Sequence, residues 1–194
     1  MKKIILIITL ISLTITNIKA QNKIIWGIKG GMSITNLTSD YFKEYNSRKE
    51  FNIGLVSEIS IGNRFSIQPE ILYAKQGAEV SEIMLGGGPQ KTEFNLDYIQ
   101  IPILTKTYIN KNISIELGPS FNFLVKDEQI NKTDSAFLTS SDFSESFELS
   151  GVIGASYNFK NEIFCSARYI HGLSNVFGNV KNTGFQIGIG YLFK

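Results

Sequence analysis

The sequence predicts an all-β fold in which eight antiparallel strands close into an up-and-down barrel. Three observations predict it. Apolar residues recur at every second position after residue 22, which is the period of a β-strand. Short polar turns alternate with long polar connections along the chain. After residue 22, no apolar run approaches the roughly 18 residues that a transmembrane helix needs. The strands are expected at roughly 23–33, 51–62, 65–78, 95–109, 113–126, 146–159, 163–171 and 183–193.

The first four strands differ in how regularly they alternate. The first contains Gly27, Gly30 and Gly31, and glycine inside a strand marks close packing or bending of a barrel wall. In the fourth, isoleucines face outward while Gln100 and Lys106 face inward. The outward apolar positions of strands two, three and four are Phe51, Ile53, Leu55, Ile59 and Ile61, then Phe65, Ile67, Pro69, Ile71 and Tyr73, then Ile99, Ile101 and Ile103.

The last four strands repeat the pattern. Small or polar residues such as Ser114, Gly118 and Gly188 stand opposite their apolar face, and Arg168 faces inward from the seventh strand. The outward positions of these strands are Ile113, Ile115, Leu117, Pro119, Phe121, Phe123 and Val125, then Phe147, Tyr157 and Phe159, then Ile163, Cys165, Ala167 and Tyr169, then Phe185, Ile187, Ile189, Tyr191 and Phe193.

The connections between the strands alternate in length. Tight polar turns are expected at 62–64, 110–112 and 160–162. Bacterial outer-membrane barrels have short periplasmic turns and long extracellular loops. We therefore expect a transmembrane β-barrel with both termini on the periplasmic side, because the strand number is even. The long extracellular loops are expected near 34–50, 79–94, 127–145 and 172–182.

This orientation sorts the outward-facing aromatic residues into two heights. Amphipathic rings favour the membrane interface, so two aromatic girdles around an aliphatic band are typical of a lipid-facing surface. A soluble β-sandwich or a lipocalin-like barrel, the two alternatives, would turn its apolar face inward. The girdles are expected to contain Phe51, Tyr73, Phe121, Phe123, Phe147, Tyr169 and Phe185 near the outer rim, and Trp26, Phe65, Tyr157, Phe159, Tyr191 and Phe193 near the inner rim.

Residues 1–20 are predicted to be a secretory signal peptide, and residues 21–194 the barrel domain. Met1-Lys2-Lys3 is basic, an apolar run extends from Ile4 to Ile15, and Ala20 offers a small residue for cleavage. Cleavage would remove three lysines and no acidic residue, so the formal charge would fall from +2 to −1. The mature chain is therefore not basic, and we expect no nucleic-acid partner.

Five stretches along the chain share a recognisable order and spacing: GIKGGMS at 27–33, SIQPEILY at 66–73, DYIQIPI at 97–103, ELGP at 116–119, and ARY at 167–169 followed by Gly172-Leu173. Together they resemble the outer-membrane β-barrel (porin-like) proteins common in Bacteroidetes. The resemblance covers nearly the whole mature chain. It implies an eight-stranded barrel in the outer membrane, but no particular activity. Such barrels usually end on an aromatic residue that the outer-membrane insertion machinery reads, whereas Phe193 is followed here by Lys194.

Charged residues occupy inward positions of several strands: Lys29, Glu58, Glu70, Lys106, Glu116, Lys126, Glu148 and Arg168. A buried unpaired charge is costly, so these side chains should pair across the lumen. The expected core is Glu70, Glu116 and Glu148 around Arg168, with Lys29 nearby. Eight strands leave an interior just wide enough for side chains to fill. We interpret the network as a polar plug, with a selective ion path through a gap in it as the alternative.

Few residues suggest catalysis. Cys165 is the only cysteine, which excludes a disulfide within the chain. His171 is the only histidine, and Ser166 and Ser174 lie near it in the sequence, which leaves a lipid-modifying enzyme as an alternative. The carboxylates are spread over several strands rather than converging on a cleft, as glycosidase chemistry would require. We expect no enzyme activity, no cofactor and no metal.

The long loops are the remaining candidates for function, because loops on rigid scaffolds commonly bind partners. The loop near 34–50 is rich in tyrosine and charge, and the loop near 127–145 is acidic. The sequence therefore predicts a monomeric barrel in the cell outer membrane, in contact with its lipid, with a structural or surface-interaction role and an extracellular ligand held by its loops. A narrow channel for small solutes or ions and a lipid-modifying enzyme are the alternatives.

Overall fold

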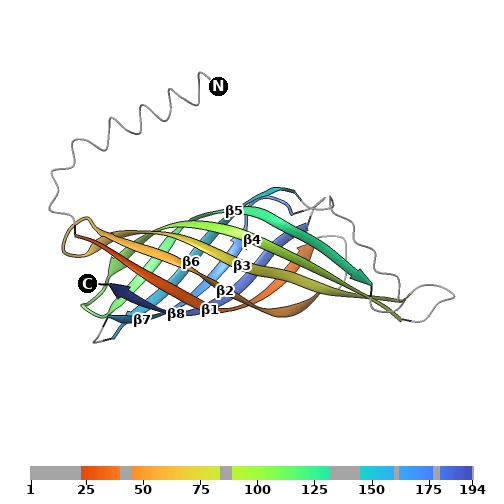
Figure 1. The fold of residues 1–194 in the computed structure, drawn as a ribbon, viewed down its shortest axis with the longest axis horizontal. Coiled ribbons are helices and arrows are strands. Elements are labelled where there is room, and N and C mark those ends of the chain that lie inside the picture. The colour runs from red at the N-terminus through yellow and green to blue at the C-terminus, as the bar shows by residue number, and fades with distance from the viewer. Residues whose placement is uncertain are drawn as a thin grey trace, which may run out of the picture.

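The computed structural model describes residues 23–39, 45–83, 89–131, 145–159, 162–176 and 180–193. Its eight strands form one closed barrel in which each strand pairs with its chain neighbours and β8 returns to β1, as Figure 1 shows. All pairings are antiparallel, so the predicted eight-stranded up-and-down barrel is confirmed. The predicted signal peptide lies outside the described residues. The strands are β1 (Ile24–Ser39), β2 (Tyr45–Ser60), β3 (Phe65–Ile83), β4 (Pro89–Tyr108), β5 (Ile113–Asn131), β6 (Phe147–Asn158), β7 (Ile163–Gly172) and β8 (Val180–Phe193).

The two ends of the barrel differ. β1 begins and β8 ends at the same end, on the left of Figure 1, and the short β2–β3 and β4–β5 connections also lie there. We call this the turn end and the opposite one the loop end. No helix among the described residues is long and apolar enough to cross a membrane.

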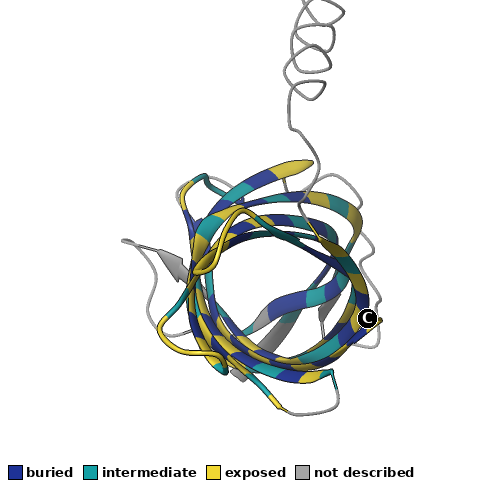
Figure 2. Cartoon of the chain, turned by 90° about the vertical axis from the view of Figure 1, so that its left-hand side faces the viewer, coloured by how far each residue is buried: buried dark blue, intermediate teal, exposed yellow. Residues whose placement is uncertain are grey.

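The wall of the barrel has an apolar outer face and a polar inner face. In β8, buried and exposed residues alternate one by one from residue 184 to residue 193. Ile187 on the outer face is 67% exposed, whereas its neighbour Gln186 is 2% exposed. Figure 2 shows the same alternation as stripes along the strands. This pattern confirms the outward apolar positions predicted from the sequence and contradicts the two soluble alternatives, which need an apolar interior.

The seam between β1 and β8 requires a glycine. A Cβ atom at Gly31 would overlap the β8 backbone at Ile187 and would lie 2.8 Å from Cα of Gly188. At neighbouring Gly30, the nearest atom to such a Cβ is the carbonyl oxygen of Asn52, at an ordinary 3.7 Å. Gly31 therefore lets the first and last strands approach closely enough to close the barrel.

The first five strands continue at least five residues further towards the loop end than the sequence pattern predicts. β3 and β5 end at Ile83 and Asn131 instead of 78 and 126, and β4 begins at Pro89 instead of 95. The alternation of apolar and polar residues fades there although the backbone ladder continues. The reason is that an outward side chain beyond the aromatic girdle does not meet lipid, so the sequence no longer marks the strand. The long loops are correspondingly shorter than predicted.

Candidate functional site in the barrel interior

The structure places all seven residues of the predicted interior network on the inner face, each at most 5% exposed. They come from seven different strands and lie at different heights of the lumen. Inward projection follows from strand parity, because alternate residues face opposite sides of the sheet. The residues are Lys29 on β1, Glu58 on β2, Glu70 on β3, Lys106 on β4, Glu116 on β5, Glu148 on β6 and Arg168 on β7.

Arg168 is the centre of the interior network. Its Nη1 and Nη2 atoms donate to the two carboxylate oxygens of Glu70 at 2.8 and 2.7 Å, and its Nε donates to Glu116 Oε2 at 2.6 Å. Lys29 Nζ lies 3.5 Å from Glu70 Oε2 and donates to Gln186 Oε1 at 3.3 Å. Arg168 and Glu70 stand on β7 and β3, four strands apart in an eight-stranded ring, so their bidentate pair spans the lumen.

Glu58 and Lys106 form a second group nearer the turn end. Lys106 Nζ lies 3.2 Å from Glu58 Oε2 and 3.9 Å from Glu116 Oε1, so it links this group to the central cluster. The other Glu58 oxygen accepts a hydrogen bond from Ser66 Oγ at 3.1 Å and one from the Tyr108 hydroxyl. Glu58, Lys106 and Ser66 are buried, and Tyr108 is half-buried. Desolvated charges of this kind are tolerated only when they are paired and hydrogen-bonded.

The expectation that Glu148 belongs to the cluster around Arg168 is wrong. Arg168 is paired across the ladder with Gly154, which lies six positions further along β6 than Glu148. The Glu148 carboxylate instead accepts a hydrogen bond from Ser150 Oγ at 2.8 Å, towards the loop end. Parity alone correctly predicts the face on which Glu148 lies but does not predict its height, which depends on strand register.

The expectation that Lys126 faces inward is also wrong. The β4–β5 register shifts at Asp97, so that Lys126 pairs with Asp97 while Leu124 pairs with Tyr98. This β-bulge inserts one extra residue into β5 and reverses the parity beyond it. Lys126 is exposed and pairs with Glu128 at 2.9 Å.

Charged residues lie on the outer face beyond the aromatic girdle, and the bulge adds Lys126 to them. The Tyr73 hydroxyl donates to Asp97 Oδ2 at 2.6 Å, and Lys75 Nζ lies 5.5 Å from the centre of the Phe51 ring. A small polar hollow of about 130 Å³ lies here, lined by Arg48, Glu50, Lys75, Gln76, Asn95, Asp97, Lys126 and Glu128. Aromatic side chains followed by charged ones are what the edge of a lipid-facing surface requires.

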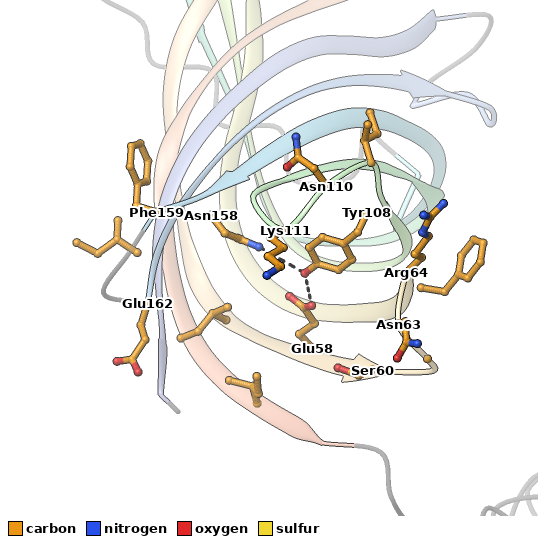
Figure 3. Close-up of a pocket in the computed structure, with 16 residues that line it drawn as sticks. Glu58, Ser60, Asn63, Arg64, Tyr108, Asn110, Lys111, Asn158, Phe159 and Glu162 are labelled. Carbon is orange, nitrogen blue, oxygen red and sulfur yellow. Dashed lines mark hydrogen bonds between the residues drawn. The ribbon is translucent and has the colours of Figure 1, made fainter.

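A pocket of about 490 Å³ opens at the turn end, and sequence reasoning did not find it. Figure 3 shows Glu58 and Tyr108 facing each other among the lining residues, with Asn158 and Lys111 on one side of them and Arg64 on the other. Asn158 Nδ2 lies 3.5 Å from the Tyr108 hydroxyl. The pocket is formed by residues of three separate turns and seven strands, so no local motif could have indicated it.

A small apolar cluster, the apolar cap, occupies the interior towards the loop end. It consists of Leu96, Tyr98, Val176 and Val180, all nearly fully buried, with Leu124 packed against them. Leu124 projects inward just below the bulge, and Val176 lies outside the predicted strands. The ion-paired middle of the lumen therefore lies between a polar pocket and an apolar cap.

The residues considered for catalysis do not come together. His171 lies on the outer face and stacks on Tyr169, whereas Ser166 is buried on the inner face. Ser174 Oγ accepts a hydrogen bond from the backbone N–H of Leu149 at 2.8 Å. Among the described residues, no three His, Cys, Asp or Glu side chains form a group that could hold a metal ion.

A closed eight-stranded barrel with an apolar, aromatic-edged outer face and a charged interior is an outer-membrane β-barrel. Comparison with known families agrees, because residues 19–178 match the family described as outer membrane protein beta-barrel domain. The chain belongs to this family, and it is located in the outer membrane of the cell.

Solved structures of outer-membrane proteins have the same fold. Neisserial surface protein A is 16% identical with a TM-score of 0.59, and the match covers 87% of this chain and 97% of that one. Ail of Yersinia pestis, solved with the heparin analogue sucrose octasulfate, is 15% identical with a TM-score of 0.51, covering 88% and 99%. No curated protein matches the chain.

Proposed function

We propose that this protein is an outer-membrane barrel with a plugged polar interior, which serves the envelope structurally or contacts partners through its extracellular loops. The observation that carries the proposal is the bidentate Arg168–Glu70 pair across the lumen, reinforced by Glu116 and Lys29. Eight strands leave little interior space beyond what side chains fill. A pore through this network would have to break buried ion pairs, which is unfavourable.

The proposed orientation places the turn end in the periplasm and the loop end outside the cell. The even strand number and the short β2–β3 and β4–β5 turns support it. The signal peptide at residues 1–20 and a Bacteroidetes origin belong to the same proposal and rest on the sequence motifs. Surface proteolysis of intact cells tests the orientation: cleavage within the loops predicted near 34–50 or 127–145, with the turn at 62–64 protected, is expected. Cleavage at 62–64 alone would reverse the topology.

Single-channel recording in planar lipid bilayers tests the plugged interior. We expect no large, steady conductance from the refolded mature protein. A reproducible conductance of porin size would refute the plug. An Arg168→Ala variant provides the matched comparison, because it removes the side chain that spans the lumen. We expect brief or noisy openings from this variant and none from an exposed Lys126→Ala control.

A narrow channel for small ions is the second candidate. The pocket at the turn end favours it, because this pocket would give solutes access to Glu58 and Tyr108 at one end of the ion-paired network. Small, ion-selective currents that change in a Glu58→Gln variant would support the channel over the plug.

We propose no enzymatic activity. The separation of His171 and Ser166 on opposite faces of β7 supports this part of the proposal. Assays with phospholipid and lipopolysaccharide substrates test it. Hydrolase or acyltransferase activity that is lost in a His171→Ala variant would overturn it.

The proposed partners are the outer-membrane lipid, the insertion machinery and an extracellular ligand, with the chain acting as a monomer. The apolar outer face supports the contact with lipid. Cross-linking in intact cells would test the monomeric state, and a dominant cross-linked dimer would contradict it.

A further inference from the structure

Glu148 is an interior carboxylate that, among the described residues, forms no salt bridge with a cationic side chain. It is 1% exposed and projects from β6 into the lumen beside the β5 residue Asn122. A chain of hydrogen bonds leads to it: Ser120 Oγ donates to Asn122 Oδ1 at 2.7 Å, Asn122 Nδ2 donates to Ser150 Oγ at 2.9 Å, and Ser150 Oγ donates to Glu148 Oε1 at 2.8 Å. These bonds satisfy only one of the two carboxylate oxygens.

With Glu148 ionised, the interior network carries one negative charge more than it has positive charges. Lys29, Lys106 and Arg168 pair with three acids, Glu58, Glu70 and Glu116. Glu148 is a fourth acid, and no cationic side chain among the described residues forms a salt bridge with it. Its Oε2 atom is buried without a hydrogen bond. An ionised carboxylate left in this state would carry a large desolvation cost.

Three polar side chains lie around the carboxylate of Glu148, and each carries an oxygen atom: Tyr98, Asn122 and Asn182. The amide nitrogens of Asn122 and Asn182 donate to Ser150 Oγ and Gln76 Oε1. The Tyr98 hydroxyl is buried and, like Glu148 Oε2, lacks a hydrogen bond. The apolar cap, which includes Tyr98 itself, lies on the side towards the loop end. Hard cations such as alkali-metal and alkaline-earth ions prefer oxygen ligands of this kind.

We propose that Glu148 Oε2 and the Tyr98 hydroxyl bind one small alkali-metal cation inside the outer half of the barrel. A single positive charge would balance the four interior acids against the three basic side chains. One carboxylate suits a monovalent ion, whereas a divalent ion usually has more acidic ligands, and the described residues contain no group of three acidic, His or Cys side chains. The proposal goes beyond the plugged interior and does not depend on whether the lumen conducts.

Thermal unfolding of the refolded full-length mature protein tests the site. The protein is refolded in detergent and melted in chloride salts of sodium, potassium, rubidium or N-methylglucamine at equal ionic strength. Refolding in each salt lets the cation enter before the barrel closes. A cation at about ten times its dissociation constant should raise the midpoint by roughly 3–6 °C over N-methylglucamine, which is too large to enter. At least one alkali-metal salt should produce this rise.

Two matched variants locate the effect. Glu148→Gln keeps the shape of the side chain and removes its charge, so its midpoint should be the same in all four salts. Glu128→Gln changes an exposed acid at the loop end and should retain the full difference. If Glu148→Gln does not refold, Tyr98→Phe replaces it and should reduce the difference.

Three outcomes would overturn the site. The first is a wild-type protein that melts at the same temperature in all four salts. In that case, the infrared band of a protonated carboxylic acid, absent in Glu148→Gln, would show that Glu148 carries a proton instead. A salt difference that persists in Glu148→Gln, or one that disappears in Glu128→Gln, would place the cation elsewhere. Failure of the plug would appear as conductance, so the two proposals fail in different experiments.

Discussion

Replacing Arg168 with methionine should destabilise the barrel, because the buried carboxylates of Glu70 and Glu116 lose the guanidinium group that they share. Methionine keeps most of the volume and removes three hydrogen bonds, two to Glu70 and one to Glu116. Removing one partner of a buried pair usually costs about 3–5 kcal/mol. Lys29 remains 3.5 Å from Glu70 and Lys106 remains 3.9 Å from Glu116, so the lower end of that range applies. We expect a loss of about 3 kcal/mol in the free energy of unfolding.

Urea unfolding of the refolded protein in lipid vesicles measures this loss. Trp26 is the only tryptophan and lies on the outer face, 61% exposed to the surroundings of the barrel, so its fluorescence should report the transfer from lipid to water. Lys126→Met is the control, because Lys126 belongs to an exposed pair with Glu128. Exposed pairs contribute about 0–1 kcal/mol, so the control should unfold almost like the wild type.

A double variant separates two explanations of the loss, bare carboxylates and lost packing. If bare carboxylates cause it, Glu116→Gln added to Arg168→Met should recover part of the stability, because Glu70 then keeps Lys29 and Glu58 keeps Lys106 as partners. A single variant within about 1 kcal/mol of the wild type would refute the reasoning, since the pair would then contribute no more than an exposed one. A double variant that recovers no stability would show that packing, and not charge, is the cause.

Three further substitutions test other parts of the structure. Gly31→Val should destabilise the folded barrel by roughly 1–3 kcal/mol through overpacking, so a smaller refolded fraction should appear on a heat-modifiability gel. Gly30→Ala should refold like the wild type, and equal refolding of the two variants would contradict the close seam. Tyr108→Phe should cost about 1 kcal/mol in urea unfolding, because Glu58 loses one hydrogen bond and keeps its others. Lys126→Gln should change the free energy of unfolding in urea by no more than about 0.5 kcal/mol, and a larger loss would show that the Lys126–Glu128 pair is not exposed.

Much of the fold could be predicted from the sequence because a strand in contact with lipid must alternate apolar and polar residues. Wherever one face meets lipid and the other meets the lumen, apolar and polar residues must alternate, as they do from Phe185 to Phe193. Beyond the girdle this requirement disappears. The strand segments after 78 in β3 and after 126 in β5 are held by backbone hydrogen bonds that leave no trace in the hydropathy of the chain.

The interior could be predicted only in part, since parity predicts the face of a residue and not its neighbours. Arg168, Glu70 and Glu116 come together because the registers of β3, β5 and β7 bring them to one height. Glu148 shares their face but lies higher, and Lys126 follows a bulge that nothing in its sequence marks. The turn-end pocket depends on turns far apart in the chain. Register, bulges and long-range contacts are therefore what the sequence alone could not supply.

The unequal strand lengths shape what the cell presents to its surroundings. β4 has 20 residues and β7 has 10, so at roughly 3.3 Å per residue one side of the barrel is about twice as tall as the other. The long strands β3, β4 and β5 extend the barrel wall on one flank at the loop end, and the described strands of the opposite flank are shorter. In the proposed orientation, a large particle that approaches the cell surface would reach the strands of the tall flank before those of the low flank.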